Sequence, residues 1–200
     1  MKLYFSTGAC SLHPQIALRE AGLPFELARV DLRSHKVSAD GSDFYAINPK
    51  GYVPVLQLDD GSYLTEGAVI VQYVADQRPE ANLMPPPGTM ARYRAQEWLN
   101  FIASEIHKAF GPLFGRTTDD AKDAARKRLA VRFDFVEKAL QAHPYVTGPT
   151  FGVVDGYLFN MLDWTKYSGI DLAAWPALQA FEARVAARPT VQAAVLAEKG

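Results

Sequence analysis

A proline-rich segment divides the chain into two parts whose apolar residues follow different periods. Residues 78–89 contain four prolines and a glycine. Proline lacks a backbone N–H and interrupts both helices and central strands. We therefore expect an interdomain linker over residues 79–88, between a first domain of residues 1–78 and a second domain of residues 89–200.

Short apolar runs alternate with turn signals before the linker. Strands are expected at Lys2–Phe5, Glu26–Asp31, Val53–Leu58 and Tyr63–Thr65. One helix is expected after Ser11, which is a good N-cap, and another from Glu66 to about Asp76. The order of elements is βαβ followed by ββα, which predicts a mixed four-stranded sheet covered by helices.

Beyond the linker the apolar residues recur at helical spacing. Three long stretches have an apolar stripe along one helical face, and two shorter helices follow them. The stripes cover residues 98–113, 125–140 and 154–165, and the shorter helices cover Trp175–Ala187 and Thr190–Leu196. The second domain is therefore expected to be all-helical, so that the fold class is α+β followed by α.

Charge and cysteine content exclude several classes of protein. The net charge is −1, so no strong field favours nucleic acid or an anionic membrane. A single cysteine excludes intrachain disulfides, and no apolar run is long enough for a signal peptide or a membrane span. We expect a soluble cytoplasmic protein without a metal and without nucleic-acid or membrane partners.

The single cysteine, Cys10, falls between the first expected strand and the first expected helix. A helix N-terminus carries partial positive charge and unpaired N–H groups, which stabilise a thiolate. A buried structural cysteine is the alternative, because free cysteine is among the most buried residue types. Position 13 is His13, so a dithiol motif of the C-x-x-C type is excluded. The location favours a reactive thiol.

The segment Asn48–Pro54 combines turn residues with a proline near the start of a strand. A cis Val53–Pro54 bond would leave the N–H and C=O of Val53 free for an extended peptide ligand. An ordinary proline at a strand entrance is an equally open interpretation.

Two further groups of polar residues are candidates for binding. Thr65 is a plausible N-cap with Glu66 in the first turn, where the helix N–H groups would take a carboxylate while Glu66 faces an ammonium. Compensation of the helix dipole is the alternative use of such an acid. Asn100, Ser104 and His107 fall on one arc opposite an apolar stripe, which is usually a solvated face.

Four segments occur in a characteristic order along the chain. They read MKLYFSTGACSLHPQIALREAGLPFEL, NPKGYVPVLQLDDG, LTEGAVIVQYVAD and EWLNFIASEIHKAFGPLF. With weaker similarity from FGVVDGYLF to RPTVQAAV, the whole chain resembles the glutathione transferase family, most closely its bacterial beta class. The resemblance implies a thioredoxin-like first domain, an all-helical second domain, glutathione as co-substrate and a homodimer.

The resemblance also implies roles for individual residues. The catalytic residues would be Cys10, Ser11 and His107. The glutathione-binding residues would be Cys10, Lys36, Val53, Pro54, Glu66, Gly67, Asn100, Ser104 and His107. Among them, Val53 would pair with the cysteinyl backbone, and Lys36 would meet the glycyl carboxylate. His35 is the alternative to Lys36, because an apparent one-residue insertion before Gly41 blurs the match.

Two positions depart from the family pattern. Gly67 stands where many relatives have serine, but a backbone N–H can still bind a carboxylate. Gly152 stands three residues before Asp155, where relatives often cap the following helix with serine or threonine. Glycine costs only a few tenths of a kcal/mol as a cap, so no misfolding is expected.

The hypothesis is attack by glutathione thiolate on small hydrophobic electrophiles, with thiol transfer through a Cys10 mixed disulfide as a second chemistry. Phe110, Phe114 and Trp164 are candidates for lining the electrophile pocket, although core packing is the simpler interpretation of each. The alternatives are a non-enzymatic carrier of glutathione or apolar ligands, and a specialised glutathione-dependent reductase or dehalogenase.

Overall fold

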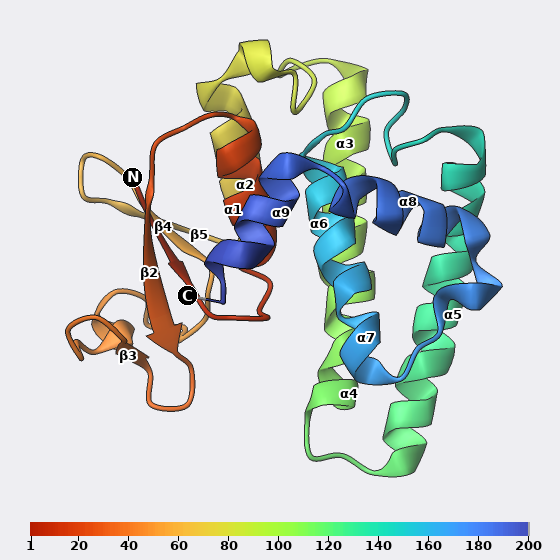
Figure 1. Ribbon diagram of the computed structural model, residues 1–200, viewed down its shortest axis with the longest axis horizontal. Helices are drawn as coiled ribbons and strands as arrows, with labels where there is room; N and C mark the ends of the chain where they lie inside the picture. The colour runs from red at the N-terminus through yellow and green to blue at the C-terminus, as the bar shows by residue number, and fades with distance from the viewer. Residues whose placement is uncertain (200) are drawn as a thin grey trace. The chain divides into compact units, whose positions relative to one another are not determined.

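The structure, a computed structural model, describes residues 1–199. Their contacts divide the chain into two compact units, which can be followed by residue colour in Figure 1. The first unit comprises residues 1–83 and the C-terminal segment from Pro189, and the second comprises residues 84–188. The division falls within the proline-rich segment, which also contains the 3-10 turn η2 (Pro79–Ala81).

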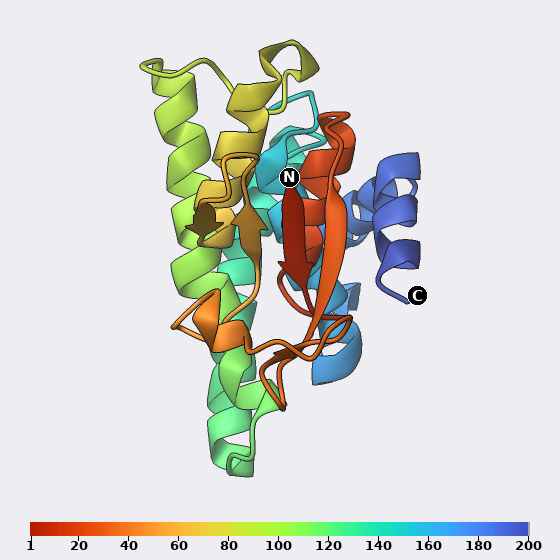
Figure 2. The same ribbon diagram turned by 90° about the vertical axis from the view of Figure 1, so that its left-hand side faces the viewer.

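A mixed sheet forms the centre of the first unit (Figure 2). Its strands are β1 (Lys2–Phe5), β2 (Glu26–Asp31), β3 (Lys36–Val37), β4 (Val55–Gln57) and β5 (Tyr63–Thr65), in the order β3-β2-β1-β4-β5. Strand β1 runs parallel to β2 and antiparallel to β4, which forms a hairpin with β5. The predicted mixed sheet is confirmed, and β3 adds a two-residue edge that the sequence pattern did not indicate.

Three helices lie on one face of this sheet (Figures 1 and 2). Helix α1 (Leu12–Glu20) packs against α2 (Gly67–Gln77) and α9 (Pro189–Ala197). The opposite face carries the 3-10 turn η1 (Phe44–Ala46), whose Phe44 is fully buried against Tyr4 and its neighbours. Burial of α1 from both sides explains why its residues from Leu12 to Leu18 are all buried.

The last helix corrects the expected domain boundary. The sequence analysis placed α9 in the all-helical domain of residues 89–200, whereas its contacts assign it to the first unit. Gln15 on α1 donates a hydrogen bond to the Ala194 carbonyl at 3.3 Å, and the Thr190 hydroxyl bonds to the Glu20 carboxylate. Helical periodicity shows that a face is apolar but not which neighbour covers it.

The second unit is all-helical, as predicted. It contains α3 (Met90–Phe101), η3 (Ile102–His107), η4 (Lys108–Phe110), α4 (Gly111–Phe114), α5 (Asp119–Ala142), α6 (Val153–Asp163), α7 (Thr165–Ser168), η5 (Leu172–Ala174) and α8 (Pro176–Ala186). Helix α6 contacts both α3 and α8 and is buried along nearly its whole length. None of the helices within residues 1–199 is both long enough and apolar enough to cross a membrane.

The single long helix expected over residues 98–113 is interrupted. After Phe101 the chain continues as the π-helical segment η3, then as the 3-10 turn η4 and the short α4. A π-helical turn holds more residues than an α-helical turn, so it rotates the side chains that follow. A helical wheel drawn for a uniform α-helix is therefore wrong beyond Phe101.

Asp155 closes the N-terminus of α6. Its carboxylate oxygens accept hydrogen bonds from the Val146 N–H at 2.9 Å and the Gly152 N–H at 2.8 Å. Gly152 is the N-cap residue and has no side chain, so only the acidic half of a capping box is present. Burial raises the pKa of Asp155 to about 7, although these backbone hydrogen bonds oppose the shift. Helix α6 therefore forms from Val153 onward with a glycine N-cap, as the sequence analysis expected.

Candidate functional site

Cys10 lies in the loop between β1 and α1, as the sequence predicts. Its side chain is half-buried, and Sγ donates a hydrogen bond to the Val53 carbonyl at 3.4 Å. The thiol lies just before the N-terminus of α1, as the sequence analysis expected. The contact corrects one expectation, because the Val53 carbonyl is engaged by this thiol instead of being free for a ligand.

The loop that carries Cys10 is held by hydrogen bonds. The fully buried Ser11 hydroxyl accepts a bond from the Ser6 N–H at 3.1 Å and donates to the Ser6 carbonyl at 3.2 Å. Within the loop, the Gly8 N–H donates to the Glu198 carboxylate at 3.0 Å and the Thr7 hydroxyl donates to the Glu198 backbone carbonyl at 2.8 Å, just beyond α9. Ser11 therefore shapes the loop and makes no side-chain cap bond to α1.

The Val53–Pro54 peptide is cis, which confirms that interpretation of the proline. Strand β4 begins just after it, and within residues 1–199 the Val53 N–H makes no hydrogen bond. Pro54 Cγ would lie 3.5 Å from a Cβ atom at Gly67, so the cis peptide adjoins the N-terminus of α2. Cys10, Val53, Pro54 and Gly67 therefore form one continuous row of contacts.

Glu66 is the N-cap residue of α2, not a member of its first turn, which corrects the assignment of Thr65 as the cap. Its backbone φ of 67° lies in a region that side chains other than glycine rarely adopt and that is typical of ligand sites. Lys50 Nζ contacts the Glu66 carboxylate at 2.6 Å. Within residues 1–199 the Gly67 and Ala68 N–H groups make no hydrogen bond, so they can receive an anion.

A buried imidazole lies against the first residue of α2. His13 is 1% exposed, and a Cβ atom added at Gly67 would lie 2.5 Å from its Cε1. The absence of a side chain at position 67 is thus what makes room for the His13 ring. Sequence reasoning used His13 only to exclude a dithiol motif and missed this contact, because it joins helices that are more than fifty residues apart in the chain.

The two candidates for binding the glycyl carboxylate have different surroundings. His35 stacks on Tyr45 with ring centroids 4.4 Å apart, and its Cε1 would lie 3.2 Å from a Cβ atom at Gly51. Lys36 begins the edge strand β3 and is exposed. Its ammonium is at the end of a long exposed side chain, whereas the His35 ring packs against Tyr45. The assignment of Lys36 stays a prediction, with His35 as the alternative.

The candidates in the helical unit divide into two kinds. Asn100 and Ser104 are exposed on one side of α3 and η3, where the Ser104 hydroxyl donates to the Asn100 carbonyl at 2.9 Å. His107 is half-buried, with Nδ1 2.8 Å from the Tyr157 hydroxyl and the Trp164 ring at 5.0 Å. Its placement on a solvated arc was wrong, because η3 turns the ring toward α6.

Burial also sets the charge of His107. Removal from water, with a smaller contribution from the Lys108 ammonium, lowers the pKa of His107 to about 4. The imidazole is therefore neutral at pH 7 and acts there as a hydrogen-bonding group, not as a cation.

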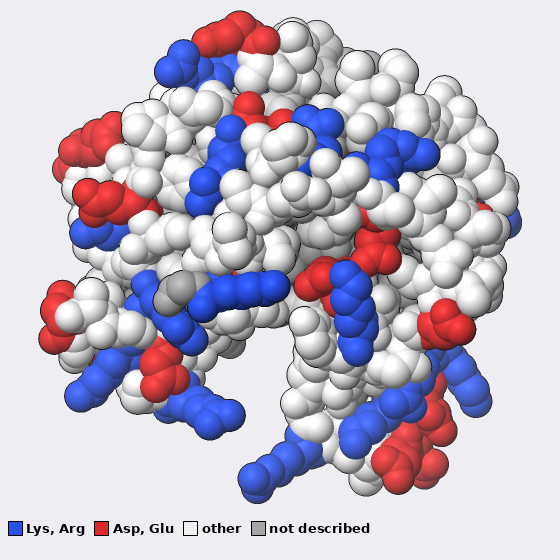
Figure 3. Space-filling model, in the orientation of Figure 1, with Lys and Arg blue, Asp and Glu red and all other residues white. Residues whose placement is uncertain are grey.

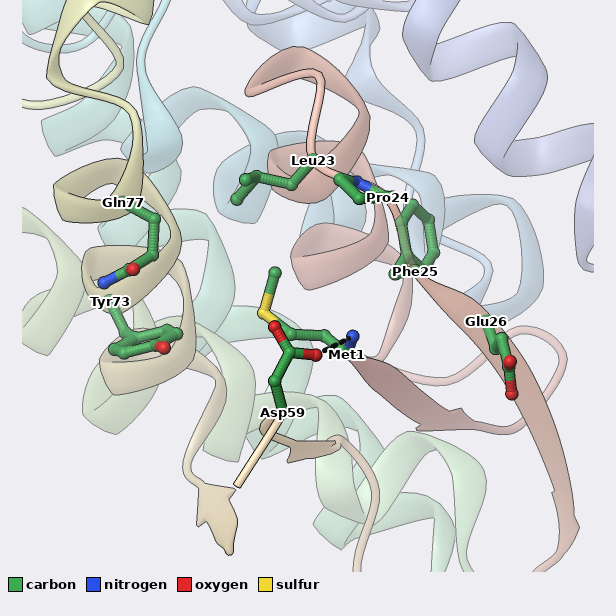
Figure 4. Close-up of a pocket in the computed structure, with 8 residues that line it drawn as sticks. All are labelled: Met1, Leu23, Pro24, Phe25, Glu26, Asp59, Tyr73 and Gln77. Atoms are coloured by element: carbon green, nitrogen blue, oxygen red, sulfur yellow. Dashed lines mark hydrogen bonds and ion pairs between the residues drawn. The ribbon is translucent and has the colours of Figure 1, made fainter. Parts of the chain in front are cut away.

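The first unit also contains a groove outside this site. A groove of about 490 Å³ lies beside Met1 and Glu26, where β1 and β2 begin (Figure 4). Tyr73 and Gln77 from α2 line it, as does Asp59, which pairs with the Met1 ammonium at 2.6 Å. None of the predicted site residues reaches it. Positive and negative side chains intermingle on the face shown in Figure 3, in keeping with the small net charge.

Comparison with known proteins matches each of the two units to a domain family. Residues 7–77 match the glutathione S-transferase N-terminal domain family, and residues 101–189 match the glutathione S-transferase C-terminal domain family. Glutathione S-transferase GstA of Escherichia coli O157:H7 is 43% identical, over 99% of this chain and 98% of its own length.

Solved structures extend the likeness to the whole fold. The ternary complex of BphK, a bacterial GST, is 55% identical with a TM-score of 0.98, and the two chains cover each other fully. A sphingomonad glutathione S-transferase complexed with glutathione is 48% identical with a TM-score of 0.96, covering 100% of this chain and 99% of its own. A bacterial beta class enzyme from Sphingomonas chungbukensis is also 48% identical, with a TM-score of 0.95 and coverage of 99% and 98%. Because both domain families match in order and the likeness spans the chain, this protein belongs to the glutathione S-transferase family, in its bacterial beta class.

Proposed function

We propose that this glutathione S-transferase joins the thiolate of glutathione to small hydrophobic electrophiles. The observation that carries the proposal is the row of contacts from Cys10 through Val53 and Pro54 to Gly67. It brings together a thiol, a backbone N–H that could pair with an extended peptide, and a helix N-terminus that could bind an anion. These are the groups that a tripeptide thiol needs.

Each part of glutathione has a partner of matching chemistry in this row. The Val53 N–H would bind the cysteinyl carbonyl, and the first N–H groups of α2, beginning with Gly67, would bind the γ-glutamyl carboxylate. Glu66 would accept its ammonium, in exchange for the Lys50 ammonium that contacts Glu66 in the structure. Lys36 would meet the glycyl carboxylate. From the helical unit we propose Asn100, Ser104 and His107 as contributors.

The reaction needs a thiolate and an electrophile held together. With an aryl halide, the glutathione sulfur forms a bond to carbon, halide leaves with the bonding electron pair, and the thiol proton passes to solvent. One unit of thiol pKa shift corresponds to about 1.4 kcal/mol of differential stabilisation. The field of α1 at Cys10 and a hydrogen bond from the neutral His107 would supply it, while Ser11 holds the loop.

Aromatic residues of the helical unit support an apolar co-substrate. The Phe110 and Phe114 rings stack with centroids 6.0 Å apart, and the Trp164 ring meets both edge-on. Phe110 is fully buried and Trp164 nearly so, which confirms core packing for these two, whereas Phe114 is 49% exposed. Phe114 is therefore the residue of this group that would contact an electrophile.

We further propose that the enzyme is a homodimer. On α3 and α5 the rings of Trp98, Phe101 and Phe135 form a cluster with centroids 5.2–5.7 Å apart. Phe135 is 54% exposed, and exposed aromatic clusters mark interaction surfaces. Sedimentation velocity measures the oligomeric state directly.

The purified protein should bind to immobilised glutathione and conjugate glutathione to an aryl halide. Glu66→Gln should raise the KM for glutathione about tenfold, because a charge-assisted hydrogen bond contributes about 1.5–3 kcal/mol before solvent screening. Glu97→Gln, which removes another exposed carboxylate with a basic partner, is the matched control. Binding without conjugation would favour the carrier alternative, and the absence of both would contradict the proposal.

Gly67→Ala should destabilise the protein and weaken glutathione binding together. Its methyl group would collide with the His13 ring, and overpacking of this kind costs about 1–3 kcal/mol. Urea unfolding and the KM for glutathione measure the two effects. The double variant His13→Ala with Gly67→Ala should regain part of both, since the ring that causes the collision is gone. If Gly67→Ala has the stability and the KM of the wild type, the His13 ring does not exclude a side chain at position 67.

A further inference from the structure

The imidazole of His107 packs against Tyr157 and Trp164, at α6 and its C-terminal end. His107 ends the π-helical segment η3, and its Nδ1 lies 2.8 Å from the hydroxyl of Tyr157 on α6. The two rings are nearly perpendicular, at 87°, and the Trp164 ring meets the imidazole at 73°. Tyr157 is 3% exposed, so its hydroxyl is fixed within the unit. These contacts restrict the rotation of the imidazole.

The hydrogen bond to Tyr157 has a chemical consequence for the imidazole. A neutral imidazole carries one hydrogen, so one ring nitrogen donates while the other accepts. A phenol is the stronger acid of the pair and imidazole nitrogen the stronger acceptor, so the favoured arrangement is donation from Tyr157 Oη to His107 Nδ1. Nε2 then carries the hydrogen. The low pKa of His107, which keeps the ring neutral, is consistent with this arrangement.

We propose that Tyr157 is a positioning residue that fixes His107 in the Nε2–H tautomer, so that Nε2 is available as a hydrogen-bond donor. The inference rests on the proposed role of His107 in the reaction. Tyr157 does not touch the substrate in this scheme and acts only through the imidazole. Without the phenol, Nδ1 would lose its donor, and the Nδ1–H tautomer, whose Nε2 can only accept a hydrogen bond, would become populated.

The tautomer can be measured without reference to activity. Protein labelled with ¹⁵N-histidine contains four histidines, and His107→Ala identifies the resonances of His107. In the wild type, Nε2 of His107 should show the shift and the one-bond proton coupling of a protonated ring nitrogen, and Nδ1 those of an unprotonated one. In Tyr157→Phe both shifts should move toward each other as the two tautomers mix. Tyr145→Phe, which removes a phenol from the same unit but not from His107, should leave them unchanged.

Kinetics then connect the tautomer to the reaction. Tyr157→Phe should lower kcat about fivefold to tenfold while leaving the KM for glutathione within about twofold, because a neutral hydrogen bond is worth about 1 kcal/mol. An unchanged tautomer in Tyr157→Phe would overturn the inference whatever the rate does, and so would a changed tautomer with an unchanged kcat. If His107→Ala itself keeps full activity, the proposed role of His107 fails, which is a separate result because the tautomer is read by NMR.

Discussion

Replacing Cys10 by alanine is expected to abolish all covalent attachment of glutathione to the protein. When wild-type enzyme is mixed with oxidised glutathione, the Cys10 thiolate should attack one sulfur of the disulfide. A protein–glutathione disulfide then forms and one glutathione thiolate leaves, so no further oxidant is needed. Cys10 is half-buried at the start of α1 and is the only thiol in the chain, so the adduct must stop at one glutathionyl group.

Intact-protein mass spectrometry measures this adduct, and a second variant separates thiol reactivity from glutathione recognition. Glu66→Gln keeps Cys10 but weakens the proposed ammonium site, so it should react more slowly with oxidised glutathione. With a small uncharged disulfide it should react at the wild-type rate. An adduct on Cys10→Ala would contradict the assignment outright. A wild type that never forms an adduct would remove thiol transfer from the proposed activities and leave conjugation as the one chemistry.

Asp155→Ala is expected to lower the free energy of unfolding by about 2–4 kcal/mol. It leaves the buried N–H groups of Val146 and Gly152 without their acceptor, and each unsatisfied buried donor costs about 1–3 kcal/mol. Urea unfolding at pH 7 measures the loss. Asp163→Ala is the matched control, because that carboxylate at the other end of α6 pairs with a half-exposed lysine. A loss equal to that of the control would show that Asp155 does not hold the helix start.

The same carboxyl should make stability depend on pH. Burial raises the pKa of Asp155 to about 7, above its ordinary value of 3.8, so the folded protein retains a proton that the unfolded chain releases. Its contribution is therefore fully present below pH 4, decreases as the pH rises toward 7 and levels off above that. The difference in unfolding free energy between the wild type and Asp155→Asn should decrease through this window. A difference that stays constant from pH 4 to pH 8 would show that the pKa is not raised.

The elements of the first unit could be predicted closely because each follows from local chemistry. The apolar run of β1 and the prolines that follow α2 both act over a few residues. Strand β3 was missed because two residues are too short for a periodic signal. The cis peptide before Pro54 was foreseen as one of two interpretations, because a proline at a strand entrance permits but does not require it.

The residues proposed for the site were found in two ways. Cys10 was found from its place before a helix, whereas Lys36 and His107 were indicated chiefly by family resemblance. Periodicity misled the analysis at His107, where the π-helical segment changes the phase of the side chains. Tyr157 was assigned to the core stripe of α6, and it is indeed buried, but no pattern in the chain could show that its hydroxyl meets an imidazole fifty residues away.

The sequence alone determined the order of the elements, the division at the proline-rich segment and the placement of a thiol at the start of a helix. Those properties depend on backbone preferences and apolar spacing, which act between neighbours in the chain. Only the tertiary structure decided that α9 belongs with α1, that Gly67 makes room for His13, and that His107 is neutral and bonded to Tyr157. Those properties depend on which distant groups exclude water and supply hydrogen bonds, and such partners are chosen by packing in three dimensions.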